Sequence, residues 1–359
     1  MSCLEPYKLE PVLLQKIWGG KNLFDLLHKG NGKDGDIGES WELSDNDTAQ
    51  NKIAEGCFAG QSFRDVYQKY SGEILGRYIH TYLKQIPRRF PLLYKFIDAN
   101  TNLSVQVHPG ERSGLGTPKS EAWYVVDAPA EAKIIVGIAS QDKPEKILTT
   151  LKTSDAPKVL NHIPVSTGDT LIIPAGTVHA ITSGLVIYEI QQNSDTTFRL
   201  YDWDRVDAHG KSRTLHFEEA ARCIDYTIHK NHKVESLRLP AENCDISVLV
   251  ACSYFSLFKY ENIKNTVPIH LNGKFKVVTC LKKDFTIVYQ NRPYRLHTGE
   301  TILIPAGCNY VELEDNAGGA IALMSTIPDM QEEIITPLKK AGYTMPEINQ
   351  LGGIRGLSW

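Results

Sequence analysis

Short apolar or alternating stretches, each bounded by glycine, proline, asparagine or aspartate, dominate the chain up to about residue 205. Stretches of this length and composition are typical of β-strands. Because helical patterns rarely separate them, we expect an antiparallel sandwich or barrel rather than a parallel sheet. The predicted strands are Leu92–Ile97, Leu103–His108, Ala122–Val126, Ile134–Val136, Thr170–Ile173, Leu185–Ile190 and Phe198–Trp203.

Three other segments have helical patterns. Between residues 58 and 88, apolar side chains that include Phe63 recur at three- and four-residue spacing, which predicts a helical insertion. The charged stretch 209–234 is expected to contain a helix that begins near Thr214. A further helix is predicted over Met330–Lys340 in the C-terminal tail.

An internal repeat organises the chain. Thr167–Gly176 recurs as Thr298–Gly307, with only Asp to Glu and Leu to Ile exchanges between the two copies. Each copy combines a glycine turn, a buried strand and a proline-glycine turn, which predicts two related β units. We therefore divide the chain into a catalytic unit over 1–235, a second, degenerate unit over 236–327 and a tail over 328–359.

Composition narrows the classes of function. The 359 residues hold 39 Lys and Arg against 42 Asp and Glu, which excludes the basic excess typical of nucleic-acid binders. No segment resembles a signal peptide or reaches the roughly 18 apolar residues of a membrane span. The seven cysteines are scattered and form no CxxC pair. This pattern argues against a disulfide framework and a thiolate zinc site, and it favours a cytoplasmic location.

The two repeats differ at one chemically important position. After the shared Pro-Ala-Gly, the first copy leads to His179 where the second has Tyr310, so we expect only the first to be active. The spacing from Gly168 through Pro174 and Gly176 to His179 resembles the second motif of cupins. In cupins this histidine is a metal ligand inside a β-barrel.

Strand alternation supplies the remaining ligand candidates. Gln106 and His108 share one face of their predicted strand, and Lys119 and Glu121 share a face where the next strand begins. With His179, the set offers two imidazoles, one carboxylate and one amide oxygen. Such a set suits zinc, with one position left for water or substrate, while other divalent metals stay open.

These residues belong to a wider resemblance, from Glu5 to about Met324, to the type I phosphomannose isomerases in their shorter bacterial form. The matching segments are Lys16–Gly20, Gly38–Glu42, Phe90–Ala99, Leu103–Pro109, Lys119–Tyr124, Pro174–His179 and Thr197–Trp203. The resemblance implies a mainly β fold of two cupin-like jelly-roll barrels. It also implies an enzyme with one zinc ion per chain that interconverts mannose 6-phosphate and fructose 6-phosphate. Arg199 would be the active-site arginine, with Glu189 and Lys119 in the same pocket.

The roles of Glu189 and Arg199 can also be argued from the residues. A hairpin turn predicted over 191–196 would make them neighbours on adjacent strands, where the guanidinium could hold a sugar phosphate or a developing enediolate. Glu189 is the candidate base, with a zinc-bound hydroxide as the alternative. A salt bridge to Arg199 would lower the pKa of Glu189 and weaken it as a base. Longer members have a second basic residue that corresponds by counting to Arg205, to which we assign no role.

Lys95 and Trp18 complete the predicted substrate pocket, with a packing role as the alternative for each. Two other functions are weighed against the isomerase: a metal-dependent cupin oxygenase and a non-enzymatic sugar-binding cupin. The oxygenases usually draw on a His-x-His pair where this chain has Gln106 and His108. The retained ligands and basic groups argue against a sugar-binding protein without activity. The expected partner is a small sugar phosphate, not a nucleic acid or a membrane, and the oligomeric state stays open.

Overall fold

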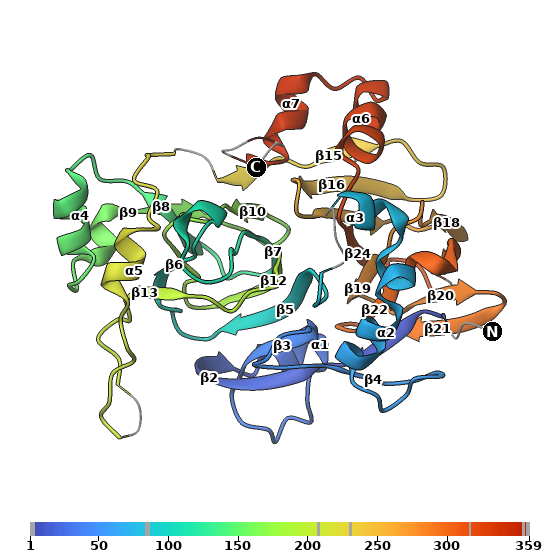
Figure 1. Ribbon diagram of the computed structural model, residues 1–359, viewed down its shortest axis with the longest axis horizontal. Coiled ribbons are helices and arrows are strands. Elements are labelled where there is room, and N and C mark those ends of the chain that lie inside the picture. The colour runs from blue at the N-terminus through green and yellow to red at the C-terminus, as the bar shows by residue number, and fades with distance from the viewer. Residues whose placement is uncertain are drawn as a thin grey trace.

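The computed structural model describes residues 4–82, 87–206, 209–229, 232–315, 317–353 and 356. In this part of the chain, antiparallel strands form four sheets, so the predicted mainly β fold is confirmed. A first unit joins a seven-stranded and a five-stranded sheet, and a second unit joins an eight-stranded and a four-stranded sheet. Figure 1 shows the first unit on the left and the second on the right.

The first unit contains most of the strands predicted from the sequence. Its seven-stranded sheet has the order β14 (Lys233–Val234), β10 (Thr170–Ile173), β7 (Glu121–Asp127), β12 (Leu185–Gln192), β5 (Leu92–Ala99), β3 (Ile37–Leu43) and β2 (Val12–Gly20). Its five-stranded sheet has the order β13 (Phe198–Tyr201), β6 (Val105–Val107), β11 (His179–Ala180), β8 (Lys133–Ile138) and β9 (Leu160–Pro164).

The second unit has the same plan. Its eight-stranded sheet has the order β15 (Leu237–Leu239), β16 (Asp245–Ala251), β17 (Ser256–Glu261), β24 (Ile321–Thr326), β19 (Lys276–Lys282), β22 (Thr301–Ile304), β1 (Tyr7–Glu10) and β4 (Lys52–Ile53). Its four-stranded sheet has the order β18 (Thr266–His270), β23 (Tyr310–Glu314), β20 (Phe285–Tyr289) and β21 (Arg292–Leu296).

The strand orders show that the sequence repeat is a structural repeat. The order β10-β7-β12-β5-β3-β2 in the first unit matches β22-β19-β24-β17-β16-β15 in the second. The order β6-β11-β8-β9 likewise matches β18-β23-β20-β21. The repeated motif forms β10 and β22 at corresponding places, so the prediction of two related β units is confirmed.

The predicted barrels are not found as closed barrels. Each unit consists of two separate sheets, and no sheet closes on itself within the residues that the structure describes. The two edge strands of a sheet do not pair with each other; in the seven-stranded sheet these are β14 and β2. The cupin-like jelly-roll description and the domain boundaries at 235 and 327 stay predictions. The N-terminal strand β1 pairs with β22, so the start of the chain lies on the second unit's sheet.

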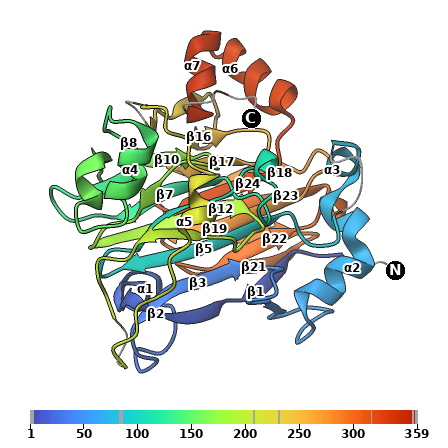
Figure 2. The same ribbon diagram turned by 60° about the vertical axis from the view of Figure 1, so that its left-hand side comes forward.

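The apolar clusters show how the four sheets stack. One cluster fills the space between the two sheets of the second unit, and a smaller one lies between the sheets of the first. The largest joins the two big sheets back to back, through residues such as Tyr94 and Tyr188 from one and Val277 from the other. Tyr188 also shares a hydrogen bond of 3.0 Å with Thr279 across this junction. Figure 2 shows β5 and β12 beside β19 and β24.

Helices cover the outer faces and the ends of the sandwiches. The predicted insertion forms α2 (Phe63–Leu75) and α3 (Arg77–Tyr82), and its last predicted residues, up to 88, include 83–86, which lie outside the described part. The remaining helical elements are α1 (Asn22–Leu27), α4 (Pro144–Thr150), α5 (Phe217–Ala221), α6 (Thr336–Lys340), α7 (Met345–Gln350), the 3-10 turns η1 (Glu111–Ser113), η2 (Ala156–Val159) and η3 (Ala306–Cys308), and the π-helical turn η4 (Met330–Ile335).

The other two helix predictions have different outcomes. The tail helix predicted over Met330–Lys340 is confirmed as η4 followed by α6. The helix predicted to begin near Thr214 is only the five-residue α5, which begins at Phe217. Helix α7 was not predicted, although Thr344 and Glu347 form a capping box at its start.

The helices and the cysteines can be compared with what the composition predicted. In the described part of the chain, none of the helices has the length and apolar character needed to span a membrane. Five cysteines there are free, namely Cys223, Cys244, Cys252, Cys280 and Cys308, and Cys57 is disulfide-bonded. The described residues therefore hold no disulfide framework, but a bridge does occur at Cys57.

A buried ion pair ties the two units together. Lys29 follows α1 in the first unit, and its ammonium lies 2.7 Å from the carboxylate of Glu42 on β3. The same ammonium donates a hydrogen bond of 2.6 Å to the carbonyl of Gly299, just before β22. Burial raises the pKa of Glu42, while the charge of Lys29 opposes that rise.

We expect Lys29→Met to lower the free energy of unfolding by about 3–5 kcal/mol, because it leaves the Glu42 carboxylate buried without its partner. Chemical denaturation followed by fluorescence measures the change. Lys158→Met is the matched control, because the Lys158–Asp155 pair has side chains that are 75% and 57% exposed and should cost below about 1 kcal/mol. Equal losses in the two variants would contradict the role given to Lys29.

Candidate metal centre and active-site cavity

Three potential metal ligands meet between the two sheets of the first unit. Glu121 begins β7 of the seven-stranded sheet, while His179 begins β11 and His108 follows β6 in the five-stranded sheet. One ligand atom from each residue lies within 4.8 Å of the others. All three side chains are buried. Residues far apart in sequence are thus brought together as the strand alternation predicted.

Backbone carbonyls fix the orientation of both imidazoles. The Nδ1 of His108 lies 2.9 Å from the carbonyl of Thr196, and that of His179 lies 2.9 Å from the carbonyl of Thr177. A carbonyl only accepts hydrogen bonds, so each Nδ1 carries the proton and each Nε2 offers a lone pair. The Nε2 atoms lie 3.5 Å and 3.3 Å from the two carboxylate oxygens of Glu121. This arrangement is typical of histidine ligands whose other nitrogen is anchored.

The Glu121 carboxylate is buried, with the Lys119 ammonium 2.7 Å from one oxygen and no hydrogen-bond donor on the other among the described residues. Burial alone would raise its pKa, but the nearby charge of Lys119, and then His108 and His179, bring it well below its usual value. Burial and the charge of Lys119 lower the pKa of His108 to about 3. Burial likewise lowers the pKa of His179. The group therefore holds an ionised carboxylate and neutral imidazoles, the protonation state that a metal ion requires.

Gln106, the fourth predicted ligand, lies on β6 opposite His179 in the strand register. Its amide nitrogen lies 3.2 Å from the Nε2 of His179. The oxygen and nitrogen of an amide are interchangeable assignments. Gln106 therefore stands next to the other three residues, and turning its amide would present the oxygen.

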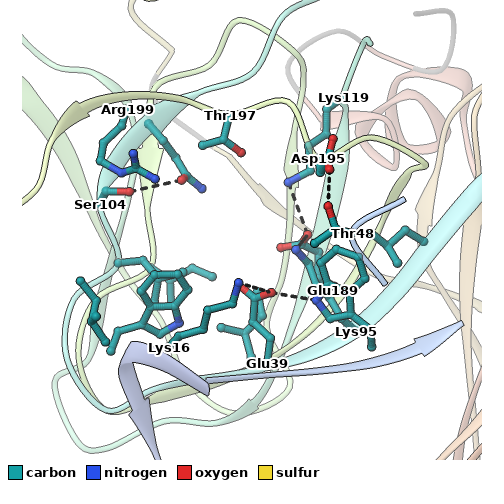
Figure 3. Close-up of a pocket in the computed structure, with 18 of the residues that line it drawn as sticks. Lys16, Glu39, Thr48, Lys95, Ser104, Lys119, Glu189, Asp195, Thr197 and Arg199 are labelled. Carbon is teal, nitrogen blue, oxygen red and sulfur yellow. Dashed lines mark hydrogen bonds and ion pairs between the residues drawn. The ribbon is translucent and has the colours of Figure 1, made fainter. Parts of the chain in front are cut away.

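A cavity of about 490 Å³ opens beside these residues, lined by both sheets of the first unit (Figure 3). Lys95, Lys119 and Glu189 line it from or next to the seven-stranded sheet. Arg199 on β13 and Ser104 just before β6 line it on the side of the five-stranded sheet. Every residue that the sequence placed in the substrate pocket, Trp18 included, lines this cavity.

Glu189 is held among donors on the wall of the cavity. One of its carboxylate oxygens lies 3.0 Å from the Lys95 ammonium and 3.6 Å from that of Lys119. The other accepts a hydrogen bond of 3.0 Å from the indole nitrogen of Trp123. Burial, followed by the charge of Glu121, raises the pKa of Glu189 against the opposing effect of the two lysines. A raised pKa makes an ionised carboxylate a stronger base.

The predicted hairpin between Glu189 and Arg199 is wrong. Strand β12, which carries Glu189, pairs with β5 and β7, whereas β13, which carries Arg199, pairs with β6. The intervening residues 193–197 carry the chain from one sheet of the sandwich to the other, so no hairpin ladder forms. The two side chains line the same cavity from different sheets, and the salt bridge that would have weakened Glu189 as a base is absent.

Arg199 and Trp18 lie away from Glu189. One terminal nitrogen of Arg199 donates a hydrogen bond of 2.8 Å to the carbonyl of Thr214, and its buried Nε has no partner in the described part of the chain. Trp18 is buried within the first unit's apolar cluster, yet it also lines the cavity. Both of its predicted roles, packing and pocket lining, are thus compatible with its position.

Sequence reasoning missed several residues of the cavity, among them Lys16, Glu39 and Arg213. Glu39 accepts a hydrogen bond of 2.8 Å from the indole of Trp41, and the charges of Lys95 and Lys16 hold its pKa low despite burial. Alternation along Gly38–Glu42 would have placed Glu39 and Trp41 on one face. Arg213 lies in an irregular segment, so no periodicity could have indicated it.

Comparison with known proteins agrees with this architecture. The profile described as phosphomannose isomerase type I, catalytic domain, matches residues 7–137. Mannose-6-phosphate isomerase ManA of Bacillus subtilis is 32% identical over 321 residues, which cover 87% of this chain and 97% of that protein. The chain belongs to the type I phosphomannose isomerase family. The predicted family and enzyme class, an isomerase, are therefore confirmed.

Other members of the family agree. Mannose-6-phosphate isomerase of Streptococcus mutans is 32% identical over 310 residues, 84% of this chain and 92% of that protein. A crystal structure of mannose 6-phosphate isomerase from Bacillus subtilis superposes with a TM-score of 0.80 at 26% identity, over 89% of this chain and 99% of that one. The enzyme from Salmonella typhimurium shares the fold, with a TM-score of 0.71 at 15% identity over 91% and 100% of the two chains.

In this isomerase chain, the second unit has lost the ligand chemistry at corresponding positions. Tyr310 takes the place of His179, and its strand partner is His270, where His179 has Gln106. The repeat residues Ile173 and Ile304 pair with Glu121 and Lys276 respectively, so a lysine stands where the carboxylate ligand would be.

Lys276 belongs to an ion-pair cluster with the C-terminal tail. Its ammonium lies 3.4 Å from the carboxylate of Glu333 on η4. Glu333 also forms an ion pair with Lys274, which is almost fully buried. The tail thus supplies a carboxylate to two lysines, whereas in the first unit one lysine faces two carboxylates.

We expect His179→Ala to weaken divalent-cation binding by more than about 100-fold, since even changes to groups behind the ligands cost 10–100-fold. Metal content after dialysis against buffered free zinc measures the loss. His270→Ala, at the position in the second unit that corresponds to Gln106, is the matched control and should keep its metal. Unchanged binding in His179→Ala would contradict the proposed ligand set.

We expect Tyr310→His to leave the metal content per chain unchanged, because the Lys276 ammonium occupies the carboxylate's place. The same dialysis experiment gives the stoichiometry. A second bound cation in this variant would show that the lysine does not exclude metal.

Proposed function

We propose that this protein interconverts D-mannose 6-phosphate and D-fructose 6-phosphate, using one zinc ion held by Gln106, His108, Glu121 and His179. The observation that supports this most strongly is the position of Glu189. It lines the cavity together with Gln106, and the Lys119 ammonium, 3.6 Å from its carboxylate, lies 2.7 Å from that of Glu121. Burial, followed by the charge of Glu121, raises its pKa. The choice of substrate is supported by the names of two relatives, both mannose-6-phosphate isomerases.

The donor set supports zinc. Two imidazoles with anchored Nδ1 atoms and a carboxylate form a set that zinc prefers, and Gln106 can add its amide oxygen. One oxygen of the buried Glu121 carboxylate lacks a hydrogen-bond donor among the described residues, which suits a further cationic partner. When bound there, the ion would polarise the sugar's carbonyl and hydroxyl oxygens.

The chain's own residues account for the proton transfer. The Glu189 carboxylate would take the proton from C2 of the open-chain aldose, and the same carboxyl group would return it to C1, while the hydroxyl proton on O2 passes to O1. Between these steps the substrate is an enediolate, whose charge the ammonium groups of Lys119 and Lys95 would stabilise. The Trp123 N–H holds the second oxygen of Glu189, which fixes the direction of the carboxylate.

The isomerase is favoured over both alternative functions. An oxygenase needs no proton shuttle, whereas here a buried carboxylate of raised pKa stands between two lysines beside the ligand group. A sugar-binding protein without activity would have no need for the anchored histidines and the carboxylate that they face.

We expect Glu189→Gln to lower kcat by about 10²–10⁴-fold with little change in KM, since a positioned general base contributes that much. An assay coupled to fructose 6-phosphate measures turnover, and exchange of the C2 hydrogen in deuterated water, followed by NMR, measures the proton step directly. Exposed Glu145 gives the matched control, Glu145→Gln, and zinc content is measured in both variants. Wild-type exchange in Glu189→Gln with zinc retained would assign the proton step to another group.

A further inference from the structure

We propose that Arg213 and Arg199 together bind the phosphate group of the sugar phosphate, so that Arg213 determines the preference for phosphorylated substrate. This inference rests on the proposed function and adds to it the group that recognises the phosphate. Counting along the family pattern instead places the second basic residue of the longer members at Arg205, to which we assign no role. The N–H groups of these three arginines have different hydrogen-bond partners.

Arg213 lies between β13 and α5, in a segment that the structure describes except for residues 207 and 208. Its Nε donates a hydrogen bond of 2.7 Å to the carboxylate of Asp202, which also accepts from one terminal nitrogen. Its guanidinium lies 5.1 Å from the ring centre of Trp18. These contacts hold Arg213 in one orientation, and its other terminal nitrogen has no bond to the described residues.

Arg205 is held by the same carboxylate but faces elsewhere. It donates to the side chain and carbonyl of Asp202 and to the hydroxyl of Thr101. Arg213 lines the active-site cavity, whereas Arg205 is absent from its lining. Asp202 thus orders two arginines, of which Arg213 is the one directed to the substrate.

Near Arg199, the carboxylate of Asp202 is already held by Arg213 and Arg205. Arg199 and Arg213 both line the cavity, and burial, followed by the charge of Arg213, lowers the pKa of Arg199 against the opposing charge of Asp202. The buried Nε of Arg199 has no acceptor among the described residues. Lys16, a third cation of the lining, lies 5.7 Å from the ring centre of Trp18, the ring that Arg213 also contacts. A phosphate dianion would satisfy these donors, because guanidinium binds its oxygens in pairs.

The position of these cations fits the order of the groups along the substrate. The reacting carbons of the sugar are C1 and C2, and the phosphate is on C6, at the other end of the carbon chain. Figure 3 shows Arg199 across the open space from Glu189 and Lys95. A sugar with C1 and C2 beside Glu189 would therefore extend its phosphate toward the guanidinium groups.

Steady-state kinetics of Arg213→Gln and Arg205→Gln test the proposal. We expect Arg213→Gln to raise KM for mannose 6-phosphate by about 10- to 100-fold and the inhibition constant of inorganic phosphate by a similar factor. Its kcat should stay within a few-fold of wild type, and Arg213→Lys should recover part of the affinity. Arg205→Gln, which keeps Arg213 and Asp202, should behave as wild type. Equal effects of the two glutamine variants, or a lower kcat at unchanged KM, would overturn the proposal.

A second measurement separates this proposal from the proposed function. Inorganic phosphate should raise the melting temperature of the wild-type protein and raise it less in Arg213→Gln, whether or not mannose 6-phosphate is turned over. If the wild type shows the phosphate effect without isomerase activity, the proposed function fails and the anion site stands. If phosphate stabilises Arg213→Gln as much as wild type, the site is wrong even where the isomerase activity is found.

Discussion

The burial of the Glu121 carboxylate is the constraint on which the rest of the site depends. An ionised carboxylate between two sheets is costly unless positive charge or hydrogen bonds compensate it. The single full charge beside it is the Lys119 ammonium at 2.7 Å, and that ammonium is shared with Glu189. The two imidazoles meanwhile turn their lone pairs toward Glu121, because carbonyls take their Nδ1 protons. The Lys119 ammonium, which also lies 3.1 Å from the Nε2 of His108, compensates this buried charge in part, and a cation bound to the ligand group would compensate it further.

A polar cavity inside one sandwich is tolerable because the other parts of the molecule are apolar. The second unit fills its interior with aliphatic and aromatic side chains, and the back-to-back junction of the two large sheets forms the largest cluster. The seven-stranded sheet uses both of its faces. On β5, Tyr94 and Phe96 pack into the junction, while Lys95 between them faces the cavity. Successive residues of one strand thus serve two purposes, because those on one face pack in the core and those on the other line the cavity.

The same alternation explains how much the sequence could predict. It placed Gln106 with His108 and Lys119 with Glu121, because these choices depend only on the period of a strand. The repeat identified the two related units and the loss of His179 in the second. The hairpin at 191–196 failed because a turn motif does not reveal whether the next strand returns to the same sheet or crosses to the facing one. Arg213 could not be found, since its position depends on Asp202 and Trp18 rather than on any local pattern.

Because residues 193–197 cross to the facing sheet, Arg199 is not the neighbour of Glu189. With Arg199 as its neighbour, Glu189 would have been a stabilised anion of low pKa and a poor proton acceptor. In the structure its neighbours are Lys95, Lys119 and the indole of Trp123, while the charge of Glu121 and burial outweigh the two ammonium groups and raise its pKa. A cation bound by Glu121 would remove part of the repulsion between the two carboxylates. The basicity of Glu189 and the occupancy of the ligand group would therefore be coupled, and Arg199, which is not paired with Glu189, is available for the phosphate-binding role proposed for it.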